Sequence, residues 1–300
     1  MSRRLLYFIN PVSGTGGKDL LLKLIAEKTT SRNIPYEIAY TNAEGDYFYL
    51  KDKIEKEGIT DIVICGGDGT VSQIASCLLE EAVNIGIIPM GSGNGLAYAA
   101  KIPKKAEKAL DIIFNGKASY IDSFYINSSF SCMLCGLGFD AQVAHDFSKQ
   151  QQRGLMTYIK QTVRNFFDAT PYSFDIVNKG KSFNTDAYFI SIANSNQFGN
   201  QFTIAPKASL SDGLLDVVIV KKMSKMKMLL AVMKQIMSGK INEYNEQTFR
   251  NKDVIYFQTP RIIIHNLENA PLHIDGDPAD TNKKFSIEII PQAFKLIQPV

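Results

Sequence analysis

The sequence lacks long hydrophobic runs, a disulfide-forming set of cysteines and any large excess of one charge. Its longest apolar stretches fall far below the roughly 18 residues of a membrane-spanning helix, which excludes an integral membrane protein built on helices. Four Cys in 300 residues exclude a disulfide-based scaffold. With 33 Lys and Arg against 30 Asp and Glu, the net charge of +3 excludes a nucleic-acid binder driven by bulk charge. We therefore expect a cytoplasmic globular protein.

Histidine is scarce, and no arrangement of His and Cys indicates catalysis or metal binding. His145, His265 and His273 are isolated in the sequence, so we expect surface or packing roles for them. Cys132 and Cys135 form a Cys-x-x-Cys pair without a second pair, which argues against a zinc site and predicts buried thiols. The chemistry of this protein is therefore expected to depend on carboxylates and backbone groups.

The chain is expected to form two domains of different class. Residues 1–122 alternate apolar strands with amphipathic helices, which predicts a parallel sheet covered by helices on both faces. The expected strands are 5–9, 36–40, 61–65 and 85–88, and the expected helices are 20–27, 47–56 and 71–79. Ligands of such sheets bind beyond the carboxyl ends of the strands.

Residues 123–300 are richer in short aromatic and β-branched stretches separated by turns, which predicts a β-sandwich. The expected strands are 120–126, 187–193, 214–220, 254–258, 261–265 and 285–290, and the expected helices are 155–167 and 225–237. The last residues are expected to pack back on the first domain. No floppy linker separates the two halves, so we expect a shared cleft that holds the active site.

The strongest local motif is Gly-Gly-Asp-Gly-Thr at residues 66–70, which follows a buried strand and opens a helix. Glycines at such a turn bring backbone amides close to a phosphate, and the helix dipole adds attraction. Thr70 is suited to be the N-cap. Asp68 would repel a phosphate unless a cation lay between them, which indicates Mg²⁺. A plain strand-to-helix turn is the alternative.

Two further glycine-rich turns follow predicted strands. Residues 10–18 resemble a P-loop, but Val12 and Asp19 stand where that motif requires Gly and Ser or Thr. Residues 91–95 read Gly-Ser-Gly-Asn-Gly and come directly after another strand. Three glycine-rich turns at the ends of neighbouring strands predict one polyphosphate site.

Together these motifs resemble the diacylglycerol kinase catalytic-domain family, which includes bacterial diacylglycerol kinase-like lipid kinases, sphingosine kinases and ceramide kinases. The resemblance rests on Asn-Pro-x-Ser-Gly at 10–14, the loop at 66–70 and Gly-Ser-Gly-Asn at 91–94. It continues through Gly-Leu-Gly-Phe-Asp-Ala at 136–141, Ala-Pro-Lys-Ala at 205–208, the segment 211–216 and Ile-Asp-Gly-Asp at 274–277. It therefore covers nearly the whole chain.

The resemblance implies an enzyme of phospholipid biosynthesis that uses ATP and Mg²⁺ to phosphorylate a lipid hydroxyl, diacylglycerol-like or sphingoid. It also implies an α/β nucleotide-binding domain followed by a β-sandwich domain. The implied nucleotide contacts are Asn10, Pro11, Val12, Ser13, Gly14, Thr41, Gly66, Gly67, Asp68, Gly69, Thr70, Val71, Ser72 and Ser92. The implied ligands of a structural Mg²⁺ are Ser209, Asp212 and Leu214, where an ordinary turn at Asp212 is the alternative.

The same resemblance implies catalytic roles for Asp277, Asp68 and Asp122. Bacterial relatives have a Glu after Asp-Gly as the proposed base, and here that position is Asp277, which is one methylene shorter. Asp68 is the rival base, and Asp122 matches a position near the active-site metal. Gly95 replaces an Asp that is usual in the diacylglycerol kinase branch, which leaves sphingoid bases and ceramides open as substrates.

The implied partner is a lipid at the inner face of the membrane, and a homodimer is left open. Lys221, Lys222, Lys225 and Lys227 lead into a Met-rich segment that either lies on an anionic surface or, as we favour, packs in the core. Two other functions stay open: an NAD kinase-like enzyme for a soluble substrate, and a non-catalytic regulator that binds nucleotide or lipid.

Overall fold

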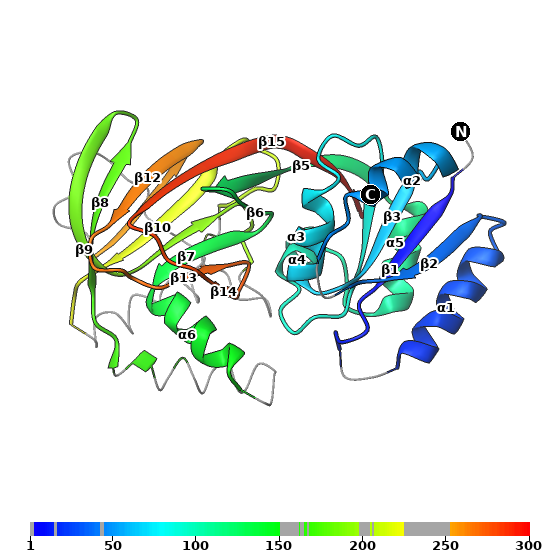
Figure 1. Cartoon of the computed structure of the whole chain (residues 1–300), viewed down its shortest axis with the longest axis horizontal. Helices are drawn as coiled ribbons and strands as arrows, with labels where there is room; N and C mark the ends of the chain where they lie inside the picture. The colour runs from blue at the N-terminus through cyan, green and yellow to red at the C-terminus, as the bar shows by residue number, and fades with distance from the viewer. Residues whose placement is uncertain are drawn as a thin grey trace. The chain divides into compact units, whose positions relative to one another are not determined.

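The computed structural model describes residues 3–14, 17–42, 45–150, 162, 165–166, 168–197, 205, 207–224 and 253–300. The chain divides into two compact units (Figure 1). The first unit comprises residues 1–122 and 291–300, and the second comprises residues 123–290.

The first unit is built around a parallel sheet. Its strands are β1 (Leu5–Ile9), β2 (Tyr36–Tyr40), β3 (Asp61–Gly66), β4 (Asn84–Pro89) and the last residues of β15 (Lys284–Gln298), in the order β2-β1-β3-β4-β15. Its helices are α1 (Lys18–Thr30), α2 (Tyr49–Glu57), α3 (Asp68–Ser76), α4 (Gly95–Ala99) and α5 (Ala106–Asn115). β1 is fully buried, as its unbroken apolar run predicted.

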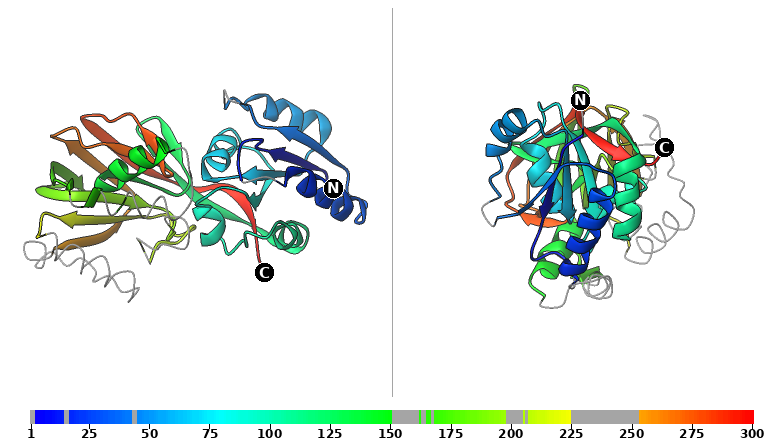
Figure 2. Two further views of the ribbon diagram at one scale, coloured as in Figure 1. Left: turned by 90° about the horizontal axis from the view of Figure 1, so that it is seen from below. Right: turned by 90° about the vertical axis from the view of Figure 1, so that its right-hand side faces the viewer.

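Helices cover both faces of this sheet. The crossover from β1 to β2 runs along the sheet in the opposite direction to those from β2 to β3 and from β3 to β4. Because such crossovers are right-handed, α1 lies on one face, and α2 and α3 lie on the other (Figure 2). α5 joins the face of α1, where Lys28 contacts Glu107 at 3.4 Å.

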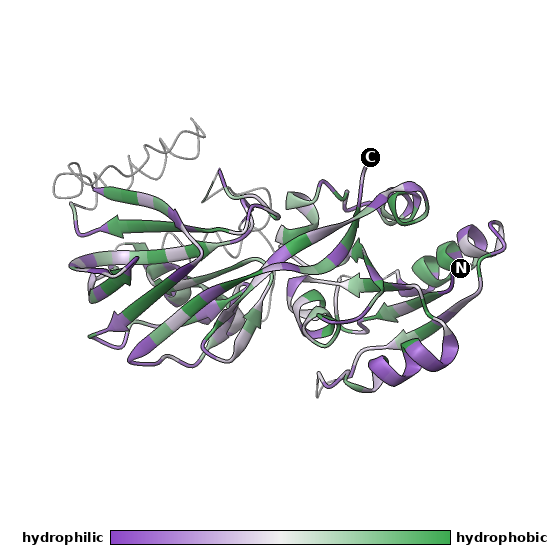
Figure 3. Cartoon of the chain, turned by 90° about the horizontal axis from the view of Figure 1, so that it is seen from above, coloured by the Kyte–Doolittle hydropathy of each residue, from purple (hydrophilic) through white to green (hydrophobic). Residues whose placement is uncertain are grey.

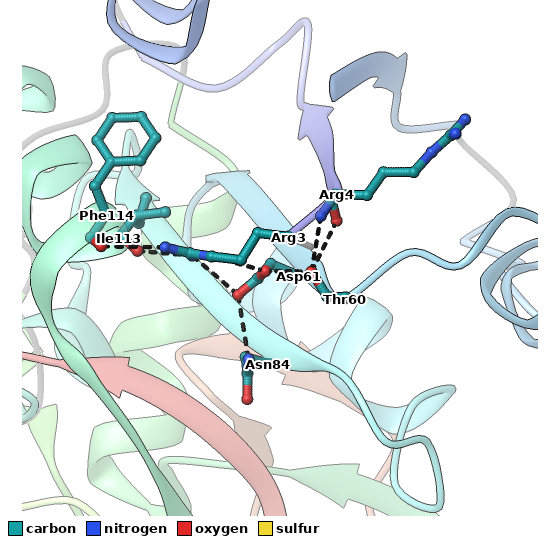
Figure 4. A network of polar contacts seen from close by, with 7 residues as sticks. All are labelled: Arg3, Arg4, Thr60, Asp61, Asn84, Ile113 and Phe114. Atoms are coloured by element: carbon teal, nitrogen blue, oxygen red, sulfur yellow. Dashed lines mark hydrogen bonds and ion pairs between the residues drawn. The ribbon is translucent and has the colours of Figure 1, made fainter. Parts of the chain in front are cut away.

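A polar network fastens the amino ends of the strands (Figure 4). Asp61 is buried, and both of its carboxylate oxygens accept hydrogen bonds from the Arg3 guanidinium, at 3.1 and 3.0 Å. The same guanidinium donates to the carbonyl oxygens of Ile113 and Phe114 in the last turn of α5. Arg3 therefore joins the start of β1, the start of β3 and the end of α5 at the edge opposite the glycine-rich turns.

The second unit consists mainly of antiparallel strands. They are β6 (Ser129–Ser131), β7 (Leu134–Gly138), β8 (Tyr172–Asn178), β9 (Lys181–Ala193), β10 (Leu215–Lys221), β11 (Val254–Thr259), β12 (Arg261–Asn266), β13 (Leu272–Ile274) and β14 (Asp277–Ala279). Parts of β5 (Lys117–Ile126) and β15 also belong here, since β5 begins in the first unit and β15 ends in it. One helix, α6 (Phe139–Ser148), follows β7 directly.

These strands enclose a common apolar core, as a sandwich requires. The long β9 pairs with β8 through its first half and with β7 and β10 through its second half. Core side chains come from both groups of strands, for example Phe174 and Ile264 from one and Leu137 and Ile219 from the other. Along β8 and β12 buried and more exposed residues alternate, and Figure 3 shows the corresponding change of hydropathy along the strands.

The structure corrects several predicted elements. α3 begins at Asp68 with Gly67 as its N-cap, so Thr70 lies inside the first turn and is not the cap. The helices α4, α5 and α6 and the strands β6, β7, β8, β13 and β14 were not predicted. The predicted helix 225–237 lies outside the described residues, as does most of the predicted helix 155–167. Among the helices that the structure describes, none has the length and apolarity to cross a membrane.

Candidate functional site

The glycine-rich turns of the first unit meet at the carboxyl ends of adjacent strands. The amide of Asn10, directly after β1, donates to the carbonyl of Cys65 in β3 at 3.0 Å. The amide of Met90, directly after β4, donates to the carbonyl of Gly66 at 2.8 Å. Thr41 extends the row beyond β2, since its amide bonds the carbonyl of Ile9 at 3.1 Å. The parallel topology thus gathers the three turns at one edge, where α/β sheets bind ligands.

The turns after β3 and β4 approach so closely that side chains are excluded between them. A Cβ placed on Gly67 would lie 3.1 Å from the Cα of Gly91, and a Cβ on Gly91 would lie 2.6 Å from the Cα of Gly67. At Gly66 a Cβ would lie 2.8 Å from the Cβ of Thr70. Glycine is therefore required here by close packing, and neither Gly67 nor Gly91 has a positive φ.

Asn10 connects the first turn to α3. Its side-chain amide donates to the Thr70 hydroxyl at 2.8 Å, and its Oδ1 accepts the amides of Val12 and Ser13 at 2.9 and 3.2 Å. The Ser13 hydroxyl in turn donates to the Asn10 carbonyl. Thr70 is therefore used to join two turns rather than to cap its own helix.

Asp68 connects the second turn to the third. Its two carboxylate oxygens accept the amides of Gly95 and Leu96, at 2.9 and 3.2 Å, which begin α4. The third turn is closed by Asn94, whose side chain both accepts from the Gly91 amide and donates to the Gly91 carbonyl at 2.7 Å. Asn94 belongs to the predicted Gly-Ser-Gly-Asn motif, but its role in closing the turn was not predicted. Its φ of 53° is of a kind that Asn adopts more readily than most residues.

The other predicted nucleotide contacts differ in their exposure. Pro11, Val12 and Ser92 are exposed, whereas Ser72 is buried on α3. Val71 is 1% exposed, and its amide donates to the carbonyl of Gly67 within the first turn of the helix. Its side chain therefore belongs to the core of the first unit.

Asp122 lies on β5 and is buried. Its Oδ1 accepts the amide of Gln292 at 2.8 Å, at a point in β15 where Gln292 has a φ of 53°. Asp122 therefore fixes a bend in β15 beside its own strand. Asp68 and Asp122 both belong to the first unit.

Asp277 belongs to the second unit and is exposed at the start of β14. It follows a two-residue turn, since Ile274 pairs with Asp277 and both Asp275 and Gly276 have positive φ values, 51° and 87°. This is the geometry of a type I′ hairpin, for which Asp-Gly is a preferred sequence. Asp275 Oδ1 also accepts the Ser131 hydroxyl at 2.6 Å, which attaches the turn to β6.

A buried pair of a His and an Asp lies next to this turn. His273 is fully buried, and its Nε2 lies 3.4 Å from Oδ2 of Asp140, at the start of α6. His145 also contacts β13, with its Nε2 bonded to the Leu272 carbonyl at 2.8 Å. This pair was not predicted, because Asp140 lies 133 positions before His273 and the two residues share no local motif.

The four Cys are free and buried, as predicted for Cys132 and Cys135. Burial raises the pKa of the Cys135 thiol well above its ordinary value, and the negative charges of Asp275 and Asp140 raise it further. Cys135 is therefore a protonated core residue at neutral pH.

The predicted structural Mg²⁺ ligands share one loop before β10. The Ser211 amide donates to Ser209 Oγ at 3.4 Å, and the Leu214 amide donates to Asp212 Oδ1 at 3.1 Å. Both side chains thus support the turn in which they lie. Among the described residues no group of three His, Cys, Asp or Glu side chains could hold a metal ion.

Comparison with known proteins agrees with this architecture. Residues 4–126 match the diacylglycerol kinase catalytic domain, and residues 134–298 match the YegS C-terminal NAD kinase beta sandwich-like domain. "Probable lipid kinase YegS-like" of Shewanella frigidimarina is 24% identical over 94% of this chain and 89% of its own length. "Diacylglycerol kinase" of Bacillus subtilis is 24% identical over 91% and 89%.

A crystal structure of a diacylglycerol kinase from Bacillus anthracis has the same fold, with a TM-score of 0.75 and 19% identity over 99% of this chain and 97% of that one. The two family matches together span nearly the whole chain, in the order that the two units show. The chain therefore belongs to the lipid kinase family in which a diacylglycerol kinase catalytic domain precedes a YegS-type β-sandwich domain.

Proposed function

We propose that this protein uses ATP and Mg²⁺ to phosphorylate a lipid hydroxyl at the inner face of the membrane. The observation that carries the proposal is the close approach of Gly67 and Gly91 at the carboxyl ends of β3 and β4. Two turns without side chains between them would let a polyphosphate approach the backbone, and α3 begins at the same edge. The match to the diacylglycerol kinase catalytic domain supports the same reaction.

In the proposed reaction the lipid hydroxyl oxygen forms a bond to the γ-phosphorus of ATP. The bond from the γ-phosphorus to the bridging oxygen breaks, and ADP leaves with its electron pair. The hydroxyl proton passes to the carboxylate of Asp277. We place the proton there because Asp68, the rival base, is the proposed ligand of the active-site Mg²⁺ and also accepts two amides from α4, so it would be a weak base.

Asp68 and Asp122 are the proposed ligands of the active-site Mg²⁺, which would offset the charge of the phosphates. Asp68 begins α3 beside the second and third turns, and its carboxylate is of the kind that this hard ion prefers. Asp122 also offers a carboxylate, a preferred ligand of this hard ion. Ser209, Asp212 and the carbonyl of Leu214 remain the proposed ligands of a separate structural Mg²⁺.

The acceptor is proposed to be diacylglycerol-like or sphingoid. The experiment is transfer from labelled ATP to detergent-dispersed diacylglycerol, monoacylglycerol, sphinganine, ceramide and undecaprenol, with NAD as a soluble acceptor and EDTA as a control. Label in one lipid, lost with EDTA, would support the proposal and name the substrate. Label in NAD alone would overturn it in favour of a soluble substrate, and ATP binding without any transfer would overturn it in favour of a regulator.

A further inference from the structure

The Asp140 and His273 pair has a defined proton arrangement. Nδ1 of His273 accepts the backbone amide of Gly276 at 3.3 Å, so this nitrogen carries no proton. The ring proton of the neutral imidazole therefore resides on Nε2, which faces Oδ2 of Asp140 at 3.4 Å. The other oxygen of Asp140 accepts the amide of Ala141 at 2.9 Å, which fixes the orientation of the carboxylate.

The sheet leaves room for this pair by having glycine at position 136. Gly136 on β7 lies opposite His273 on β13. A Cβ placed on Gly136 would lie 2.1 Å from Oδ2 of Asp140 and 2.5 Å from Nε2 of His273. Any larger residue at this position would therefore separate the two side chains.

The pair is connected directly to the turn that presents Asp277. The Gly276 amide, which His273 accepts, immediately precedes Asp277 in the chain. The other half of the turn is held independently, since Asp275 Oδ1 accepts the amides of Met133 and Leu134 at 3.2 Å. His273 therefore holds the half of the turn that is adjacent to the exposed carboxylate.

We propose that Asp140 and His273 act as a positioning pair for Asp277, an inference that rests on the function proposed above. The carboxylate of Asp140 keeps the ring proton on Nε2, and this leaves Nδ1 as an acceptor for the Gly276 amide. If the proton were on Nδ1, this N–H and the Gly276 amide would both be donors facing each other. The turn would then move away from His273. A carboxylate displaced by about 1 Å costs on the order of 100-fold in rate.

Asp140→Asn tests the proposal without a change of shape. Its Oδ1 can still accept the Ala141 amide, so its NH₂ group faces His273 and favours the opposite tautomer. We expect kcat to fall on the order of 100-fold, with the Kd of ATP unchanged. Asp146→Asn is the matched control, since Asp146 also lies on α6 but its carboxylate bonds Gln142, Lys149 and Asn165 instead of His273. This control should keep the wild-type kcat.

The tautomer itself is measurable by ¹⁵N NMR of the imidazole rings. The protein has only three His, so substitution of His145 and His265 by Gln assigns the spectrum. We expect the Nε2-protonated form of His273 in the wild type and the Nδ1-protonated form in Asp140→Asn. An Nδ1-protonated ring in the wild type would overturn the proposal.

A double substitution separates positioning from simple packing. His273→Asn places an amide oxygen near the position of Nδ1 and needs no partner to do so. In that background Asp140→Asn should lower kcat by less than about threefold, whereas equal losses in both backgrounds would contradict the proposal. Asp277→Asn tests the proposed function separately: full activity in that variant removes Asp277 as the base, and the positioning role with it.

Discussion

The carboxylate of Asp68 spans two elements, because its oxygens accept the amides of Gly95 and Leu96 while its backbone begins α3. One side chain thus sets the distance between two glycine-rich turns. Gly95 occupies the position where the diacylglycerol kinase branch usually has Asp, and the Gly95 amide is one of the two that Asp68 binds.

Asp68→Ala is expected to lower kcat at least about 100-fold. The third turn would lose its hydrogen bonds to α3, and the proposed Mg²⁺ would lose one of its protein ligands. Phosphoryl transfer measured beside circular dichroism should show an inactive, folded protein. Asp52→Ala is the control, since Asp52 is exposed on α2 and forms an ion pair with Lys56 on the same helix. Normal turnover in Asp68→Ala would remove Asp68 from the active site.

Gly91→Ala should weaken ATP binding, because the new methyl group would press on the Cα of Gly67 and on Oδ1 of Asn94, 2.9 Å away. Titration calorimetry with a non-hydrolysable ATP analogue measures the change, for which we expect about tenfold or more. Gly58→Ala serves as the comparison. The new Ala would have to adopt a φ of 64°, but its Cβ would meet no described atom within 4 Å beyond its chain neighbours. The substitution should therefore lower stability and leave ATP affinity unchanged.

Asp277→Asn should abolish transfer while leaving the Kd of ATP unchanged, since the proposed proton acceptor is lost but the glycine-rich turns are intact. Asp277→Glu should retain activity, because the longer side chain restores the residue that bacterial relatives have at this position. Asp280→Asn removes a charge from an exposed site just after β14 and is expected to be neutral. Full activity in Asp277→Asn would show that Asp277 is not the proton acceptor.

The two neighbouring Arg residues at the start of β1 should contribute unequally to stability. Arg3→Met leaves the buried carboxylate of Asp61 without its main partner and two α5 carbonyls without a donor, a loss of roughly 3 kcal/mol. Arg4→Met removes only a surface pair with Glu57, so stability should hardly change. Urea denaturation compares the two, and equal losses would contradict this account.

Stability should also depend on pH through Asp216, which is fully buried on β10. Burial raises the pKa of its carboxyl, and this outweighs the hydrogen bonds from Tyr256 and Gln258, which lower it. A raised pKa in the folded state stabilises the fold below the ordinary carboxyl pKa of about 3.9 and loses that contribution as pH rises through the folded value.

Asp216→Asn does not titrate, so its free energy of unfolding should rise relative to the wild type as pH increases from about 4 towards neutrality. Denaturation at several pH values measures this difference. Asp280→Asn, at an exposed position, should follow the wild type throughout. A pH-independent difference for Asp216→Asn would show that Asp216 ionises normally in the folded protein.

Local patterns predicted those parts of the fold that depend on local sequence. The strands β1 and β3 were predicted from short apolar runs, and α2 was predicted from its helical pattern. By contrast, α4 has five residues and begins at a glycine, and β14 has three residues that include Pro278, so neither has a readable period.

The site, like the fold, was predictable where it depends on local sequence. The glycine-rich turns and their common edge follow from motif and topology. The roles of individual side chains depend on partners far away in the sequence: Thr70 bonds Asn10 across 60 positions, and His273 contacts Asp140 across 133. Only the folded structure shows that Thr70 joins two turns and that His273 binds the turn that precedes Asp277.

The first unit is not continuous in the chain. Lys295 and Leu296 of β15 pair with Asn84 and Ile85 of β4, and residues 291–300 belong to the first unit. During synthesis the ribosome therefore releases residues 1–122 with one sheet edge still open. That edge is completed only after the entire second unit has been translated, so the first unit starts to be made before the second and is finished after it.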